Sequence, residues 1–316
     1  MKFEPIELFN TYSIVARDEQ TGNLGVAVQT HQMCVGAHVP WLKSGIGAVA
    51  TQSLVNLHFG PMGLSMLQEG VPAQKVVNAL VASDKDAHVR QVAVVDNKGR
   101  VGAWTGPNCI SEAGHHIGDG YSVQANMMTH PNVVKAMADA YENASGVLAE
   151  RMMSALHAAQ SEGGDIRGMQ SAALVIVGEH FLGTGDPFEE RSIYDLRVDE
   201  HEYPLEELDR LVRFRRAQLI DTEGYRQLEE GHRDEAINTW MRARQLAPEL
   251  EEMAYWQAVT LADEYNDVIT AAKILSQMLM KEVRKDHWID LIKRLQYCGI
   301  IERQGAGDEL LAQLDL

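Results

Sequence analysis

The chain has 316 residues, of which 45% are hydrophobic and 23% charged, as is usual for folded globular proteins. Its net charge of −17 argues against binding to nucleic acid or to an anionic membrane surface, because both depend on clusters of lysine and arginine. Three cysteines without metal-ligand spacing, and an N-terminus without the pattern of a signal peptide, indicate a protein of the reducing cytoplasm.

The first two thirds of the chain combine short apolar segments typical of strands with amphipathic segments typical of helices. We expect strands at Tyr12–Ala16, Leu24–Gln29, Gly47–Gln52, Gln91–Asp96, Val101–Thr105, Tyr121–Asn126, Ala172–Val177 and Ser192–Val198. We expect helices at Gly60–Glu69, Pro72–Ser83, Asn132–Asn143 and Val147–Ser161. Grouped strands separated by paired helices predict an α+β domain built as a four-layer αββα sandwich, and they argue against a doubly wound fold.

From about residue 204 glycine becomes rare and helix-forming residues dominate. Six residues there resemble one tetratricopeptide repeat in their spacing: Gly224, Gly231, Ala236, Trp240, Ala243 and Pro248. The small residues would let two helices approach closely, and Trp240 would fill the space between them. We therefore expect an α-helical domain over residues 204–316, which packs, dimerises or caps the first domain, or offers a peptide groove.

The common cofactor and catalytic signatures are missing, so nucleotide-binding, serine-hydrolase and zinc-protease classes are not expected. His58, His115, His116 and His130 have no acidic residue at ligand spacing, and adjacent histidines on a strand point to opposite faces. We therefore expect no metal and no cofactor, and interpret the histidines as hydrogen-bonding groups in glycine-rich turns. Cys34 and Cys109 are expected to be buried.

Several segments together resemble a known family. They are Thr11–Asp18 (TYSIVARD), Gly25–Gln29, Val35–Trp41, Gly45–Asn56 (GIGAVATQSLVN), Gly60, Gly63-Leu64, Arg90-Gln91, Gly114-His115, Asn126 and Gly163–Leu174 (GGDIRGMQSAAL). In this order they closely resemble the domain-of-unknown-function family 1028, whose members are similar to N-terminal nucleophile hydrolases. The resemblance covers roughly residues 11–177 and leaves out the helical C-terminal part.

The resemblance implies an αββα sandwich and a mechanism. Proteins of that superfamily use the first residue of the mature chain as nucleophile and its α-amino group as general base. Such an amine has an ordinary pKa near 8, so at neutral pH it can accept the hydroxyl proton. Thr11 is the matching residue, and residues 1–10 form a leader that must be removed before Thr11 has a free amine. The alternative is that Thr11 simply opens a strand.

Further roles follow from position relative to Thr11. His31, which follows Thr30 at the end of the neighbouring strand, is a candidate to orient the amine. Asp18 and Arg17, just past the first strand, are candidates to tune its pKa, although such a pair is often a surface ion pair.

Backbone N–H groups and amide side chains after the Gly47–Gln52 strand suggest an oxyanion hole with Gln52, Ser53 and Asn56. Helix capping by Ser53 and turn formation by Asn56 are the alternative roles. Further candidate substrate-binding residues are His58, His115 and Asn126.

The glycine-rich segment from residue 163 places polar residues directly before an apolar strand. Arg167 is a candidate to bind a substrate carboxylate through its two-pronged guanidinium group, and Ser171 is a candidate catalytic residue. A buried pair of Asp165 with Arg167 that fixes the loop is the competing interpretation.

Three functional hypotheses remain open. The first is a hydrolase of an amide-type C–N bond in a small-molecule substrate, with Thr11 as nucleophile. The second is a ligand- or protein-binding module of the same fold without catalysis. The third is an unprocessed enzyme that uses internal residues such as His58, His115 and Asp165. Exposed sheet edges and the helical tail favour a homodimer, and the tail is a candidate site for a protein partner.

Overall fold

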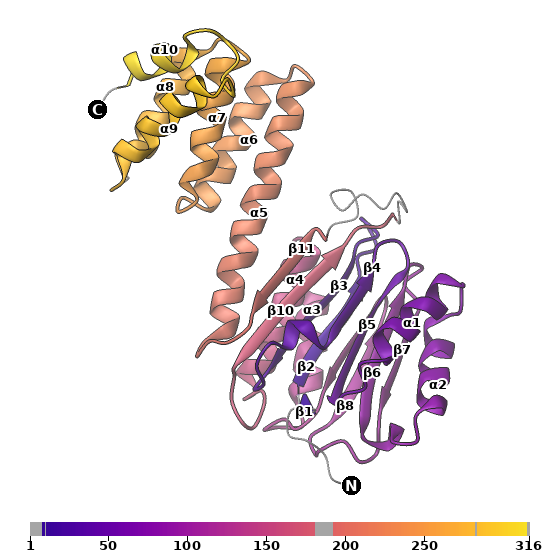
Figure 1. Ribbon diagram of the computed structural model, residues 1–316. Coiled ribbons are helices and arrows are strands. Elements are labelled where there is room, and N and C mark those ends of the chain that lie inside the picture. The colour runs from indigo at the N-terminus through magenta and orange to yellow at the C-terminus, as the bar shows by residue number, and fades with distance from the viewer. Residues whose placement is uncertain (1–7, 10, 181–191, 282, 315–316) are drawn as a thin grey trace. The chain divides into compact units, whose positions relative to one another are not determined.

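The computed structural model describes residues 8–9, 11–180, 192–281 and 283–314 of the chain. These residues form two compact units, Met1–Val212 and Arg213–Leu316, which are described separately below. The helix α5 (Pro204–Glu229) begins in the first unit and ends in the second. Figure 1 shows strands gathered in the first unit and helices alone in the second.

The first unit contains two antiparallel sheets. One sheet consists of β1 (Leu8–Phe9), β4 (Pro40–Lys43), β5 (Gly47–Leu54), β6 (Arg90–Asp96) and β7 (Val101–Thr105), in the order β1-β5-β6-β7 with β4 also on β5. The other consists of β2 (Thr11–Arg17), β3 (Leu24–Thr30), β8 (Gly114–Gly118), β9 (Tyr121–Ala125), β10 (Ser171–Val177) and β11 (Tyr194–Val198), in the order β11-β10-β3-β2-β9-β8.

Alternating residues of the central strands explain how the layers pack. On β5, Val49 packs against the helices α1 (Phe59–Gln68) and α2 (Ala73–Ser83) together with Val76 and Leu80. Its neighbours Ala48 and Ala50 belong to the apolar cluster that also holds residues of β2, β3 and β10. Successive side chains of a strand point to opposite faces, so one face of this sheet is covered by helices and the other faces the second sheet.

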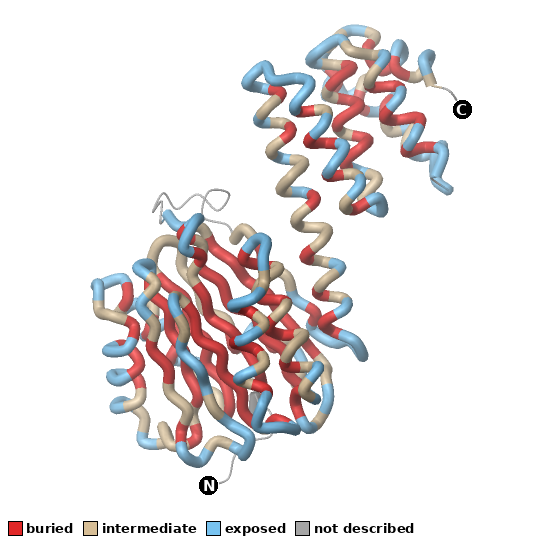
Figure 2. The backbone as a smooth tube through the Cα atoms, turned by 180° about the vertical axis from the view of Figure 1, so that it is seen from behind, coloured by how far each residue is buried: buried red, intermediate tan, exposed pale blue. Residues whose placement is uncertain are grey.

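The second sheet is covered by α3 (Val133–Asn143) and α4 (Leu148–Ser161). Met152 of α4 lies so close to Gly25 of β3 that a Cβ atom there would be 2.7 Å from the methionine sulfur. Tyr12 of β2 donates a hydrogen bond to Gln160 of α4 at 2.9 Å. The central strands of both sheets are buried along most of their length, as Figure 2 shows in red.

The expectation of an α+β chain with a helical C-terminal part is confirmed, and the expected strands and helices are present with ends shifted by up to two residues. Three strands were not expected: β1, which lies in the predicted leader, β4, whose four residues begin at Pro40, and β8, which contains His115 and His116. The interpretation of these histidines as turn residues is wrong, because pairing with β9 holds the glycine-rich segment extended. Cys34 and Cys109 are only half-buried, not buried as expected.

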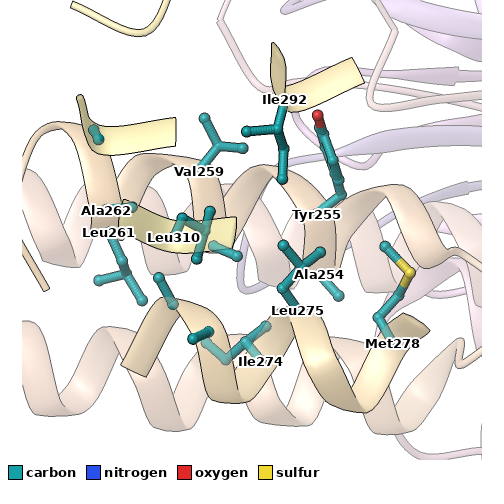
Figure 3. Close-up of a cluster of buried hydrophobic side chains, with 14 of the residues drawn as sticks. Ala254, Tyr255, Val259, Leu261, Ala262, Ile274, Leu275, Met278, Ile292 and Leu310 are labelled. Carbon is teal, nitrogen blue, oxygen red and sulfur yellow. The ribbon is translucent and has the colours of Figure 1, made fainter. Parts of the chain in front are cut away.

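The second unit consists of helices only within its described residues. After α5 come α6 (Arg233–Leu246), α7 (Glu251–Asp263), α8 (Val268–Leu279), α9 (Lys285–Tyr297) and α10 (Ala306–Ala312). Trp240 of α6 is fully buried against Gly224 of α5, where a Cβ atom would lie 2.3 Å from the indole ring. Figure 3 shows the apolar cluster of α7, α8, α9 and α10 around Leu275. Among the described helices, none has a stretch long and apolar enough to span a membrane.

Candidate functional site

Three hydroxyl-bearing residues lie next to one another at one end of the second sheet. Thr11 begins β2 and is paired with Thr30 at the end of β3, which in turn is paired with Ser171 at the start of β10. All three are fully buried. The antiparallel register therefore places Thr11 in one row with Thr30, at the end of the strand expected beside it, and with Ser171, the candidate catalytic residue.

A chain of buried hydrogen bonds connects the two sheets beside Thr11. Gln124 Nε2 donates to Ser13 Oγ at 2.6 Å, and Ser13 Oγ donates to Gln52 Oε1 at 2.6 Å. Gln52 Nε2 then donates to Gln91 Oε1 at 2.7 Å and to the carbonyl oxygen of Thr11 at 3.2 Å. We call Ser13, Gln52, Gln91, Gln124 and Asn126 the inter-sheet network. It places polar groups beside Thr11 within an otherwise apolar interface.

Asn126 extends this network toward the end of β9. Its backbone N–H donates to the Thr11 carbonyl at 3.1 Å, and its side-chain nitrogen donates to Gln91 Oε1 at 2.8 Å. The Asn126 side-chain oxygen is buried and accepts no hydrogen bond within the described part of the chain. A buried acceptor without a partner is costly in a static core, so this oxygen is available to a ligand or water.

His115 joins the network at its outer edge. Gln91 Nε2 donates to Thr105 Oγ1 at 2.9 Å, and that hydroxyl lies 2.8 Å from His115 Nδ1. Partial desolvation and the adjacent His116 lower the pKa of His115, which favours its neutral form at neutral pH. The structure thus connects His115 to Gln52 and Asn126 through Gln91.

The Asp165–Arg167 pair lies at the end of β3, beside Thr30 and His31. Asp165 is only 2% exposed, and Arg167 Nε and Nη2 donate to its two oxygens at 3.0 and 2.7 Å. The same carboxylate accepts the backbone N–H of His31 at 3.2 Å, directly after Thr30. Because Asp165 occupies the guanidinium fork of Arg167, the pair fixes the loop in this form of the protein, as the competing interpretation held.

His31 and Ser171 mainly hold backbone in place here. His31 Nδ1 is 3.2 Å from the carbonyl oxygen of Met169. Ser171 Oγ donates to the carbonyl oxygen of Gln32 at 2.5 Å and accepts the N–H of Val35 at 3.1 Å. These bonds tie the ends of β3 and β10 to the neighbouring loops, close to Thr11 in the strand register.

Ser53 has an unusual backbone for a buried residue. Its φ is +70°, in the left-handed region that costs a non-glycine residue on the order of 1 kcal/mol. Ser53 directly follows Gln52, and Cys109 lies close enough for a contact between their side chains. Burial raises the pKa of the Cys109 thiol, which keeps it protonated and unreactive. Strain at this position beside the network is typical of functional sites.

Other predicted residues are placed outside the network. Asn56 Nδ2 donates to Asp84 at 2.8 Å and its Oδ1 accepts the N–H of His58 at 3.1 Å, so this amide organises the start of α1. His58 itself is exposed. The structure therefore gives Asn56 the turn-forming role that the alternative interpretation described, and we do not propose it as an oxyanion donor.

Arg17 and Asp18 lie at the opposite end of β2 from Thr11. Six residue steps of a strand span about 20 Å, too far for a direct effect on the Thr11 amine. Asp18 accepts hydrogen bonds from two turn N–H groups and from Arg151 at 2.5 Å. Burial of the Asp18 carboxyl raises its pKa, but these hydrogen bonds outweigh it and hold the pKa below the ordinary value. The Asp18–Arg151 ion pair is thus a structural contact with α4, and Arg17 lies 3.7 Å from Glu179 instead of pairing with Asp18.

Sequence reasoning missed three members of the network, Ser13, Gln91 and Gln124. A signal was present, because β5, β6 and β9 each carry a glutamine near one end of an apolar run: Gln52, Gln91 and Gln124. A buried glutamine needs partners on another strand. Which strands face each other is decided by tertiary packing.

The arrangement suits acid–base and hydrogen-bonding chemistry. In the described residues no group of three or more His, Cys, Asp or Glu side chains is arranged to hold a metal ion. What surrounds Thr11 are amide donors, hydroxyls and one carboxylate–guanidinium pair. Such groups can bind and polarise a carbonyl group, and they can hold a hydroxyl nucleophile in place.

Comparisons with known proteins agree with this fold. Residues 11–208 match the model of the family of unknown function DUF1028. The chain is also similar to the crystal structure of protein SPO2555 from Silicibacter pomeroyi, whose description names the same family model, DUF1028. The two sequences are 27% identical, the TM-score is 0.58, and the match covers 64% of this chain and 84% of that chain. No curated protein matches the sequence significantly. Because the family model covers more than half of the chain, the protein belongs to the family of unknown function DUF1028.

Proposed function

We propose that the protein is a hydrolase of amide-type C–N bonds in small molecules, with an αββα sandwich of the N-terminal nucleophile type and Thr11 as nucleophile. The observation that carries this proposal is the position of Thr11, which begins a central strand, is fully buried and adjoins the inter-sheet network. The two sheets, each covered by a helix pair, support the sandwich assignment.

The proposed reaction starts once removal of residues 1–10 gives Thr11 a free α-amine. The amine accepts the hydroxyl proton as Thr11 Oγ1 attacks the substrate carbonyl carbon, and the proton then passes to the departing nitrogen. A water molecule hydrolyses the resulting ester, which releases the acid and restores the hydroxyl. Burial lowers the pKa of an amine, which increases its unprotonated fraction at neutral pH.

The inter-sheet network supplies candidates for binding the developing oxyanion. Gln52 and Asn126 both carry side-chain N–H groups directed toward the Thr11 carbonyl, at 3.2 and 3.5 Å. A modest change after processing would let these amides donate to a substrate oxygen instead. Removal of one such donor in a hydrolase typically costs a factor of about 10²–10³ in rate.

The experiment combines mass measurement with activity. We expect intact-protein mass spectrometry of the untagged chain to show a species that begins at Thr11, and that species to hydrolyse members of a panel of small amides. Thr11→Ala should abolish hydrolysis, whereas Thr11→Ser should retain part of it. Thr222→Ala, at an exposed position of α5, is the matched control. Equal hydrolysis by wild type and Thr11→Ala would overturn the proposal.

A second candidate function is a non-catalytic binding module. It is favoured by the pairing of Leu8–Phe9 with Ser53 and Leu54 of β5, which builds part of the leader into a sheet. A chain that keeps its first ten residues and hydrolyses nothing in the panel, but binds a small molecule, would support it. The internal-residue enzyme is not favoured, because His58 is exposed at α1 and the Asp165 carboxylate is bound by Arg167.

A further inference from the structure

The helical unit contains a groove that the proposed hydrolysis does not use. The groove has a volume of about 640 Å³, within the range of ligand-binding cavities. Helices α6 and α8, the turn between α6 and α7, and the first residues of α7 line it. The whole groove lies within the unit of residues 213–316 and is independent of Thr11.

Apolar side chains form the inner surface of this groove. Ala254, Ile274 and Met278 line it, and each is less than 10% exposed. Ile274 and Met278 lie one helical turn apart on α8, on the same face (Figure 3). Met241 of α6 also lines the groove and is 43% exposed. An apolar stripe of this kind provides anchor points for the apolar face of a peptide.

Positive charges border this apolar stripe. Lys273 and Lys281 line the groove and are exposed, and neither has an acidic partner within the part of the chain that the structure describes. The acidic groove residues are already engaged: Glu249 accepts from Arg213 at 2.6 Å, and Glu251 lies 3.7 Å from Arg284. Residues 213–316 hold 14 lysines and arginines against 19 acidic residues, so this cationic border stands out on an acidic unit.

Arg244 adds a third cation that is held in place from behind. Its Nη1 donates to Gln257, a fully buried residue whose own Nε2 donates to Asp221 at 2.5 Å. Arg244 also lines the groove. A cation anchored by a buried amide loses less side-chain entropy on binding than a free one, so it is a favourable contact for a carboxylate.

We propose that this groove binds an acidic amphipathic peptide segment of a partner protein. Its apolar side chains lie on Ala254, Ile274 and Met278, and its carboxylates face the three cations Arg244, Lys273 and Lys281. Charge complementarity selects an acidic segment and speeds the encounter, while burial of the peptide's own apolar side chains and of Met241 adds to the affinity. The net charge of the whole protein repels other acidic proteins, so this local positive border confines their approach to the groove.

The test is a selection of peptides from a display library of random 12-residue sequences on the immobilised full-length chain. We expect the selected peptides to be enriched in Asp, Glu and large apolar residues, and to bind more weakly as salt concentration rises. The double variant K273E/K281E should weaken binding at least tenfold. The matched control is K285E/K293E, which makes the same charge change at exposed positions of α9 outside the groove.

Circular dichroism would verify that both double variants are folded. Retained binding by K285E/K293E together with the loss in K273E/K281E is the result that supports the groove. The proposal is overturned by a selection without enrichment, by peptides rich in lysine and arginine, or by equal effects of the two double variants. None of these results depends on Thr11 or on hydrolysis, so they leave the proposed function to its own test.

Discussion

Replacing Gln91 by leucine tests whether the inter-sheet network excludes water, as its buried hydrogen bonds indicate. Gln91 is fully buried, and its Oε1 accepts hydrogen bonds from Gln52 and Asn126 at 2.7 and 2.8 Å. Its Nε2 donates to the carbonyl oxygen of Ala125 at 2.9 Å. Leucine has a similar size but no polar atom, so the change removes these bonds and leaves the partner groups buried.

The magnitude follows from the bonds that remain. Without Gln91, Gln52 Nε2 keeps its 3.2 Å bond to Thr11, whereas Asn126 Nδ2 keeps only a 3.5 Å contact. Each buried group that loses its partner costs about 1–3 kcal/mol. Because Gln52, Asn126 and the Ala125 carbonyl each lose a short bond and the two donors keep only longer contacts, we expect the free energy of unfolding of the first unit to fall by about 3 kcal/mol. For a unit of this size, that corresponds to a melting temperature lower by about 6–12 °C.

Scanning calorimetry of the full-length chain would measure this shift. Gln74→Leu is the control, because the Gln74 side chain is exposed on α2 and hydrogen-bonded to Asn78, one helical turn away, so the change should alter the free energy of unfolding by less than about 0.5 kcal/mol. If Gln91→Leu destabilises the first unit by no more than the control does, the network is accessible to water and the reasoning is refuted. Amide hydrolysis should also fall in Gln91→Leu if the network positions Gln52 and Asn126.

Two further predictions concern the helices. The His157 ring N–H donates a hydrogen bond to the Asp209 carboxylate, which raises the pKa of His157 despite partial burial. This contact of α4 with α5 therefore stabilises the first unit below about pH 6.5, and the stabilisation is lost as pH rises through the raised pKa. Unfolding measured from pH 5 to 9 should show this slope, and an unchanged slope in His157→Gln would contradict it. Gly224→Ala would place a Cβ atom 2.3 Å from Trp240 and should destabilise the helical unit by about 1–3 kcal/mol. Gly178→Ala, where an added Cβ atom would have no atom within 4 Å, is the control. Equal melting temperatures of the Gly224→Ala and Gly178→Ala variants would show that the helices can separate without cost.

Much of the secondary structure could be predicted from local patterns. The segments Thr11–Arg17 and Ser171–Val177 identify strands because short β-branched, apolar runs bounded by turn residues are typical of buried strands. The paired helices could be located from amphipathic spacing and from prolines at their starts. β8 was missed because its glycines and exposed histidines carry no apolar period, and only pairing with β9 makes it a strand.

The candidate site depended on long-range pairing to a greater degree. Thr11, Asp165 and Arg167 were identified from sequence, but the partners of each were decided by the register of β2, β3 and β10 and by the loop that follows α4. Asn56 is close to Gln52 in sequence, yet β5 carries it beyond the network to Asp84. Spacing along one strand does not reveal which groups another strand will present opposite it.

The sequence by itself therefore determined the α+β character, the helical C-terminal part and the family resemblance, since these rest on local periodicity and on residue order. Only the tertiary structure decided that Gln52, Gln91 and Gln124 share one buried network with Ser13, because each needs a hydrogen-bond partner from another strand or from the opposite sheet. The physical reason is that periodicity is a property of neighbouring residues, whereas the pairing of buried polar groups is a property of the assembled core.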